Sequence, residues 1–187
     1  MNFLDDANVR AVRLITFDLS RAFDCVPHHL LLSCISKLSL PDCNSFVNWL
    51  RSYLYDRKQR VKLGDTKSSL ISVSSGVPQG SVLGPILFAV YLSTYKTLDK
   101  NVNVIKYADD VSLVIPVFRK DTDDISLVTK EIEHFESWCK SHHMSINFSK
   151  SKVLNVNFGR VPLSLLPSLE NVSVIKILGV LFNDRLI

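Results

Sequence analysis

Residues 125–139 constrain the fold most, because they carry the clearest helical periodicity in the chain. Apolar side chains recur there at steps of three and four, at Ile125, Val128, Ile132, Phe135 and Cys139. This spacing places them on one face of a helix. Such a face is stable in water only when another element buries it. The sequence therefore predicts a helix that packs on a further layer of structure.

Short apolar runs supply that further layer. They are typical of buried strands, and helical patterns alternate with them along the chain. Strands are expected at 12–17, 59–63, 70–74, 102–107, 111–117, 153–158 and 172–182, helices from Pro27, over 44–55 and over 86–98, and a loop over 76–85. No repeat or linker divides the chain. We therefore predict one α+β domain over residues 1–187, with an antiparallel sheet covered by helices.

Composition excludes several classes of protein. Of the 187 residues, 47% are hydrophobic and 21% are charged, which excludes disordered and collagen-like chains. No apolar run approaches the ~18–20 residues that span a bilayer, so no membrane partner is expected. The first residues are acidic and resemble no signal peptide, so we expect an intracellular protein, without distinguishing nucleus from cytoplasm. Cys139 near His142 and His143 is expected to be ordinary packing, since a zinc site needs more ligands.

Two groups of carboxylates lie at the ends of predicted strands. Asp18 directly follows the strand that ends at Phe17, and Asp109 and Asp110 lie between two strands. Mg²⁺ prefers oxygen ligands of this kind, and two such ions can hold the attacking and leaving oxygens of a phosphoryl displacement. Adjacent acids between strands are also common as plain turn residues. The apolar strands on both sides argue against that alternative.

Three motifs resemble a known family. The segments 17–24 (FDLSRAFD), 75–88 (SGVPQGSVLGPILF) and 107–110 (YADD) are similar to motifs A, B and C of the palm of reverse transcriptases from non-LTR (LINE-type, jockey-like) retrotransposons. Residues 48–61 resemble the family's block between motifs A and B, and residues 138–180 contain segments similar to motifs D and E. The resemblance implies a polymerase palm.

The resemblance also implies the catalytic residues. Asp18 and Asp109 match the metal-binding aspartates, and Asp110 matches a third, less exacting carboxylate. Two Mg²⁺ ions, or Mn²⁺, are implied as cofactors. Lys150 matches the motif D lysine that can protonate pyrophosphate, and Lys152 is the alternative in the neighbouring register.

Part of motif A is implied to contact the incoming nucleotide. Phe23 matches the aromatic residue beneath the sugar, where a ring leaves no room for a 2′-hydroxyl. Without the resemblance, Phe23 would be interpreted as a core aromatic. The backbone N–H groups of Arg21 and Ala22 are expected to meet the triphosphate.

Motifs B and E are implied to hold the base pair and the primer. Pro78, Gln79 and Gly80 resemble the segment that touches the nascent base pair and the template, and the amide of Gln79 can hydrogen-bond there. Leu178 and Gly179 match the hairpin that grips the primer end.

The densest basic stretch is a candidate template-binding segment. It contains Tyr53 and Tyr55, and aromatic rings near basic residues can stack on single-stranded bases. A solvated helix end with both tyrosines turned inward is the alternative. The basic residues are Arg51, Arg57, Lys58, Arg60 and Lys62.

We therefore predict an RNA-directed DNA polymerase that uses an RNA template, a DNA primer and deoxynucleoside triphosphates, in an oligomeric state left open. Only 17 residues precede Asp18 and seven follow Val180, so fingers and thumb are expected to be largely missing and synthesis by this chain to be barely processive. The alternative is a catalytically silent remnant that at most binds nucleic acid. A palm-type RNA polymerase or nucleotide cyclase is disfavoured by Phe23 and the loop at Val77–Ser81.

Overall fold

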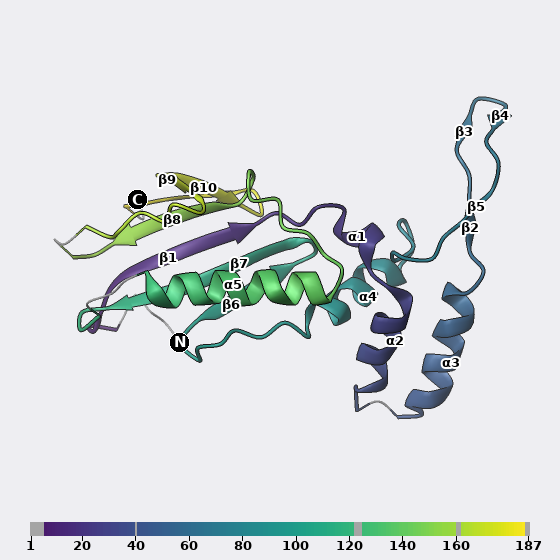
Figure 1. The fold of residues 1–187 in the computed structure, drawn as a ribbon, viewed down its shortest axis with the longest axis horizontal. Helices are drawn as coiled ribbons and strands as arrows, with labels where there is room; N and C mark the ends of the chain where they lie inside the picture. The colour runs from purple at the N-terminus through teal and green to yellow at the C-terminus, as the bar shows by residue number, and fades with distance from the viewer. Residues whose placement is uncertain (1–5, 40, 122–124, 160–161, 186–187) are drawn as a thin grey trace. The chain divides into compact units, whose positions relative to one another are not determined.

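The computed structural model describes residues 6–39, 41–121, 125–159 and 162–185. These residues form two compact units (Figure 1). Of the described residues, those within 1–20, 95–141 and 145–187 belong to the first unit, and those within 21–94 and 142–144 belong to the second. The single domain expected from the sequence therefore stays a prediction. Within the described ranges, no helix is both long and apolar enough to cross a membrane.

A five-stranded sheet forms the centre of the first unit. Its strand order is β6 (Asn103–Tyr107), β7 (Asp110–Phe118), β1 (Val9–Phe17), β8 (Lys152–Asn157) and β9 (Glu170–Val172). All neighbouring strands are antiparallel except β8 and β9, which are parallel. The expected antiparallel sheet is thus corrected at one edge. Twelve residues separate β8 from β9, which is the length that a parallel return needs.

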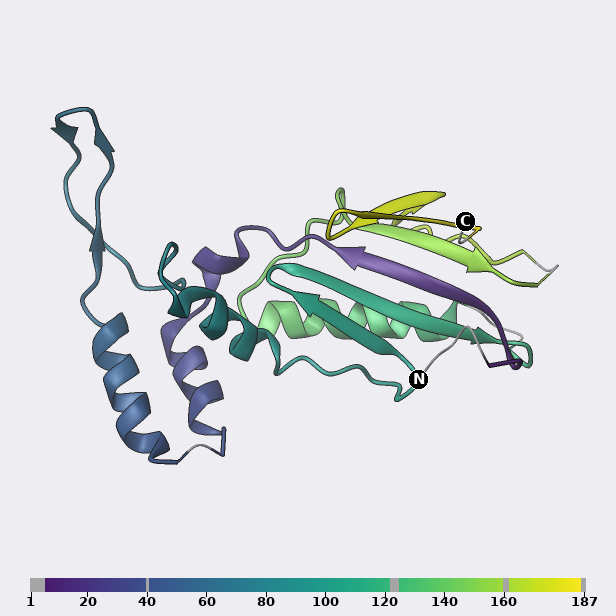
Figure 2. The ribbon, with the colours of Figure 1, turned by 180° about the vertical axis from the view of Figure 1, so that it is seen from behind.

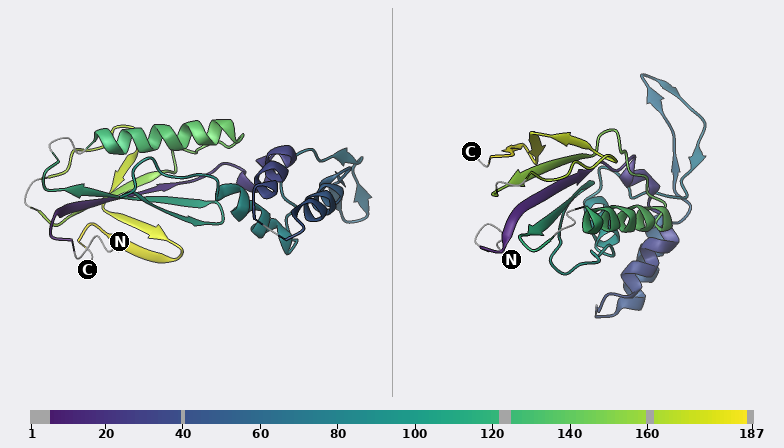
Figure 3. Two further views of the ribbon diagram at one scale, coloured as in Figure 1. Left: turned by 90° about the horizontal axis from the view of Figure 1, so that it is seen from below. Right: turned by 60° about the vertical axis from the view of Figure 1, so that its left-hand side comes forward.

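The two faces of this sheet are covered by different elements. Helix α5 (Ser126–Ser141) packs on one face, where the rings of Phe17 and Phe135 lie 4.6 Å apart between centroids. The hairpin of β10 (Val174–Ile177) and β11 (Val180–Asn183) lies on the other face (Figure 3), where Ile175 joins Leu154 in a small apolar core. The predicted packing of this helix on a further layer of structure is confirmed.

A buried carboxylate holds the segment that leads into β6. Glu131 of α5 is fully buried and accepts the backbone N–H groups of Leu98 and Asp99, at 3.2 and 2.8 Å. The expected helix over 86–98 is wrong here, because the helix ends at Leu92. The apolar pattern alone predicts a helix in this segment. The segment is stable as a loop because one buried carboxylate accepts hydrogen bonds from two of its backbone N–H groups.

Helices dominate the second unit. They are α1 (Ala22–Cys25), α2 (His28–Ser36), α3 (Cys43–Leu54) and α4 (Leu83–Leu92). Helix α2 follows Pro27 as predicted. Each of α2 and α3 has a buried apolar face. It consists of Leu31 and Ile35 in α2, and of Val47, Leu50 and Leu54 in α3.

A thin hairpin follows α3 (Figures 1 and 2). Its base pairs β2 (Lys58–Gln59) with β5 (Ile71–Ser72), and its tip pairs β3 (Lys62–Leu63) with β4 (Thr66–Lys67). Gly64 and Asp65 form the turn between β3 and β4, in which Gly64 has a φ of 59°. Glycine tolerates this left-handed conformation without steric strain.

Helix α4 begins three residues before the predicted position. The expected loop over 76–85 therefore ends at Val82, and Gly84 and Pro85 lie in the first helical turn. Proline fits there because the first N–H groups of a helix have no intrahelical acceptor. A side chain at Gly84 would approach the carbonyl oxygen of Pro78 to 2.7 Å, so this position accepts only glycine.

Candidate functional site

Strand register brings the carboxylates of the first unit together. Phe17 of β1 pairs with Val111 of β7, so Asp18, just beyond β1, lies beside Asp110 at the start of β7. Tyr107 pairs with Asp110 across a two-residue turn, in which Ala108 has a φ of 51° and Asp109 is exposed. The structure therefore joins two sequence segments that lie 91 positions apart.

Mutual repulsion is visible in the acidity of Asp110. The pKa of its carboxyl group is raised, first by burial and then by the negative charges of Asp109 and Asp18. Each carboxylate makes ionisation of its neighbour less favourable at short range. All three acids thus contribute to one region of negative potential.

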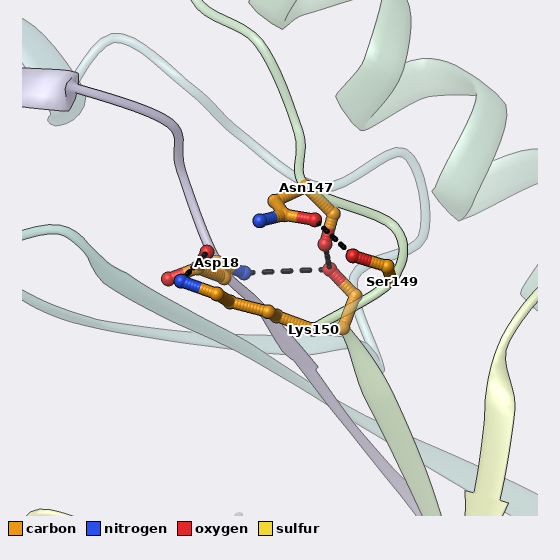
Figure 4. A network of polar contacts seen from close by, with 5 residues as sticks. Asp18, Asn147, Ser149 and Lys150 are labelled. Carbon is orange, nitrogen blue, oxygen red and sulfur yellow. Dashed lines mark hydrogen bonds and ion pairs between the residues drawn. The ribbon is translucent and has the colours of Figure 1, made fainter.

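A turn after α5 fixes the backbone of Asp18 (Figure 4). The N–H of Asn147 donates to the carbonyl oxygen of Asp18 at 2.8 Å. The hydroxyl of Ser151, which is fully buried, accepts the N–H of Asp18 at 3.4 Å and donates to the carbonyl oxygen of Asn147 at 2.9 Å. Hydrogen bonds to both its N–H and its carbonyl oxygen therefore fix the backbone of Asp18.

Two lysines on this turn and strand have different partners. The ammonium nitrogen of Lys150 lies 3.8 Å from a carboxylate oxygen of Asp18 (Figure 4), whereas that of Lys152 lies 3.6 Å from Glu170. The side chain of Lys150 is 69% exposed. Only Lys150, of these two, forms an ion pair with one of the predicted catalytic acids.

Asp18, Asp110 and Lys150 border a cavity of about 470 Å³. It lies on the sheet face that carries the β10–β11 hairpin, and its other lining residues include Thr16, Ser112, Lys152 and Ile175. The hairpin turn consists of Leu178 and Gly179, with φ values of 49° and 87°. An exposed leucine rarely adopts such a φ, so this turn is locally strained.

The three acids have the donor chemistry of a divalent metal site. Asp18, Asp109 and Asp110 offer only carboxylate oxygens, which suit a hard divalent cation, and their repulsion is what such a cation relieves. Among the described residues, however, no three His, Cys, Asp or Glu side chains lie close enough to share an ion. Repulsion among the three acids and the ion pair of Asp18 with Lys150 both favour this separation.

The second unit contains the remaining part of motif A. The ring of Phe23 stacks on that of the buried Phe88, with centroids 4.4 Å apart. Asp24 accepts a hydrogen bond of 2.7 Å from the side-chain amide of Gln79. The N–H of Val77 donates to the carbonyl oxygen of Phe23 at 2.8 Å, so motifs A and B are joined through backbone and side chains.

A second cavity, of about 630 Å³, connects motif B with the base of the hairpin. Arg57 and Lys58 line it together with Pro78, Gln79 and Asp24. The structure thus brings two predicted nucleic-acid-binding residues beside two predicted substrate-binding residues, all within the second unit.

Other predicted residues lie apart from these two cavities. Arg51, Arg60 and Lys62 are exposed on α3 and the hairpin. Arg21 is exposed with a φ of 48°, and Ala22 is buried at the start of α1. Their expected roles toward the triphosphate and the template stay predictions, as does that of Gly80.

Sequence reasoning missed four residues that organise these sites. Ser151 and Asn147 hold Asp18, Asp24 holds Gln79, and Glu131 holds the segment before β6. Asp24 and Gln79 lie inside motifs A and B, so the motifs themselves indicated that these residues could belong to the site. Nothing in the local pattern distinguishes Ser151 from the exposed serines around it.

Comparison with known proteins gives the family. A model of the family described as "Reverse transcriptase (RNA-dependent DNA polymerase)" matches residues 5–182. The chain is 33% identical over 181 residues to the probable RNA-directed DNA polymerase from transposon X-element of Drosophila melanogaster, covering 90% of this chain and 19% of that protein. It is 32% identical over 148 residues to the RNA-directed DNA polymerase from mobile element jockey of the same fly, covering 75% and 16%. The chain therefore spans less than a fifth of the length of these two relatives.

Solved structures give the same fold. Telomerase from Candida tropicalis in complex with a fragment of telomeric RNA matches with a TM-score of 0.66 and 16% identity, covering 97% of this chain and 30% of that one. The apo telomerase of that yeast without its C-terminal domain matches with a TM-score of 0.65, also at 16% identity, covering 97% and 35%. At this identity the likeness concerns the fold, which is the predicted polymerase palm with its mixed α and β structure.

Proposed function

Since this chain belongs to the reverse transcriptase family, we propose that it supplies the palm of a non-LTR retrotransposon RNA-directed DNA polymerase. The reaction is addition of a deoxynucleotide to a primer 3′-hydroxyl opposite an RNA template. One observation carries the proposal: the pairing of Phe17 with Val111, which sets Asp18 beside the Asp109–Asp110 turn.

Asp18, Asp109 and Asp110 are the residues that would hold the divalent ions. Because the described residues contain no group of three such side chains close enough to share an ion, the three carboxylates would have to move closer to one another on binding. Bound Mg²⁺ supplies positive charge that lowers the pKa of the primer hydroxyl and neutralises the triphosphate. Phosphoryl transfer depends mostly on positioning and charge, so acids fixed at strand ends suit it. The hydrogen bonds around Asp18 support its role, because they fix the backbone from which the carboxylate extends.

Lys150 is the proposed proton donor to the leaving pyrophosphate. Its side-chain nitrogen lies 3.8 Å from a carboxylate oxygen of Asp18, at the edge of the same cavity. Lys152 instead pairs with Glu170, which favours the Lys150 register.

In the second unit, Phe23 is proposed to exclude the ribose 2′-hydroxyl. Its stacking on the buried Phe88 fixes the ring, which a steric role requires. Gln79 is proposed to contact the nascent base pair. One N–H of its amide is donated to Asp24 and the other N–H and the amide oxygen are available to bases.

Single-nucleotide addition tests the proposal directly. The chain, in excess over a DNA primer on an RNA template with Mg²⁺ and one deoxynucleotide, should extend the primer by one residue. Asp109→Asn should abolish extension, and the exposed Asp184→Asn, at a carboxyl outside the acid cluster, should not. Excess protein removes processivity from the measurement. Extension by neither the wild type nor Asp184→Asn would favour the alternative, a silent remnant.

A further inference from the structure

Helix α3 carries two adjacent rows of apolar side chains. The aliphatic row, Val47, Leu50 and Leu54, is buried. The aromatic row, Phe46, Trp49 and Tyr53, begins one residue earlier and has the same spacing. Rows one residue apart lie about 100° apart around a helix of 3.6 residues per turn. Burial of the aliphatic row therefore leaves the aromatic row outside that face.

The aromatic row is a continuous set of rings, of which Phe46 and Trp49 are exposed and Tyr53 is half-buried. Trp49 is 50% exposed and Phe46 is 38% exposed. Ring centroids of Phe46 and Trp49 are 5.9 Å apart, and those of Trp49 and Tyr53 are 5.8 Å apart with planes inclined by only 8°. The rings thus support one another in a shared orientation, with much of their surface in water.

Positive charge continues this row at its C-terminal end. The guanidinium carbon of Arg57 lies 5.3 Å from the centroid of the Tyr53 ring. Residues 43–75 contain six Lys and Arg but only two Asp and Glu, and one of those acids, Asp56, pairs with Lys58 at 3.7 Å. This segment therefore has an excess of positive charge equal to the +4 of the whole chain.

We propose that the aromatic row of α3 is a stacking surface for single-stranded nucleic acid, which on the proposed function is the template strand. The proposal rests on that function for the identity of the strand. Its chemistry rests on the rings and charges of α3 and the hairpin. Bases stack on exposed aromatic rings whatever their sequence, while neighbouring cations hold the phosphates.

The path of the strand follows from the second cavity. Arg57 both ends the aromatic row and lines the cavity that contains Pro78 and Gln79. Helix α3 leads directly into the hairpin at this point (Figure 1). A strand with one base near Gln79 would pass Arg57 and continue over Tyr53, Trp49 and Phe46. The row thus accommodates unpaired template bases next to the base being copied.

Intrinsic fluorescence measures this directly, because the chain has two tryptophans and the other, Trp138, is buried. The probes are the twelve-residue oligomers (dT)12 and (rU)12 and an abasic deoxyribose phosphate strand of equal length. Both oligomers with bases should quench the fluorescence of Trp49. The abasic strand should bind more weakly and leave the fluorescence unchanged.

Variants separate stacking from charge. Trp49→Ala should weaken (dT)12 binding by roughly 5- to 150-fold, the range that stacking of one base corresponds to. Trp49→Phe should keep most of the affinity. The matched control is Phe158→Ala, which removes a 44% exposed aromatic side chain in the first unit, outside the row, and should change affinity little. Circular dichroism verifies that each variant is folded.

Several outcomes would overturn the stacking surface. Equal affinity for (dT)12 and the abasic strand would mean that only phosphates are bound. Quenching by (dT)12 but not by (rU)12 would exclude an RNA template. Loss of self-association in Trp49→Ala without loss of oligomer binding would make the row an interface between copies. No nucleotide or primer is present, so failure of polymerase activity leaves these results unaffected.

Discussion

Ser151→Ala should loosen the backbone of Asp18, one of the proposed metal-binding acids. The Ser151 hydroxyl is fully buried, donates to the carbonyl oxygen of Asn147 at 2.9 Å and accepts the N–H of Asp18 at 3.4 Å. The Asn147 oxygen keeps two backbone donors, from Lys150 and Ser151, so it is not left unsatisfied. The N–H of Asp18 loses this acceptor.

The magnitude follows from these contacts. One hydrogen bond contributes about 0.5–1.5 kcal/mol net to stability. Leaving the N–H of Asp18 without this acceptor costs in addition a fraction of the ~1–3 kcal/mol desolvation penalty of a buried donor, because the bond that is lost is long. We expect a loss of about 1–2 kcal/mol in the free energy of unfolding, or roughly 2–8 °C in Tm for a chain of this size. Exchange of the Asp18 amide hydrogen should accelerate by about 5- to 30-fold if the loss is local.

The matched control is Ser149→Ala in the same turn. Its hydroxyl is exposed and donates only to the side chain of Asn147, at 2.7 Å. Such surface changes usually stay within about 0.5 kcal/mol. Urea denaturation gives the global effect, and amide exchange followed by NMR gives the local one. Equal effects of Ser151→Ala and Ser149→Ala on the Asp18 amide would refute the reasoning.

Three further predictions concern the chemistry of the two sites. Asp109→Asn should lower the pKa of Asp110, which a carboxyl NMR titration without divalent ions measures. A carboxyl pKa that is raised in the folded state lowers the free energy of unfolding as pH rises from the unfolded to the folded pKa, so the variant should lose less of this free energy over that interval. Lys150→Gln should slow single-nucleotide addition by about 100- to 10,000-fold, whereas Lys152→Gln should not. Phe23→Ala should raise ribonucleotide use relative to deoxyribonucleotide, while Phe23→Tyr, which keeps the ring, should not; equal discrimination in both variants would leave Phe23 as a packing residue.

The local elements of this fold could be predicted because their signals are local. The apolar spacing from Val128 to Cys139 predicts α5, and Pro27 predicts the start of α2. Gly64 predicts a turn, because left-handed backbone favours glycine. Each of these signals depends on residues within a few positions of one another.

Pairings between distant segments could not be predicted in this way. Nothing local to Lys152–Asn157 indicates that this strand lies beside β1, or that its other neighbour is parallel. The early end of α4 could not be predicted locally either, because the segment that follows the helix is held by the carboxylate of Glu131, more than thirty residues later. Tertiary contacts override helix propensity where a distant side chain accepts the hydrogen bonds of the backbone N–H groups.

The sequence by itself determined which residues could perform chemistry: acids at strand ends, an aromatic within motif A and a glutamine in a Gly- and Pro-rich loop. Only the tertiary structure decided that Asp18 lies beside Asp110, that Lys150 contacts Asp18, and that Asp24 holds Gln79. The reason is physical. Side-chain type and spacing follow from the local chain, whereas distance between charges depends on strand register, which forms only when the sheet assembles.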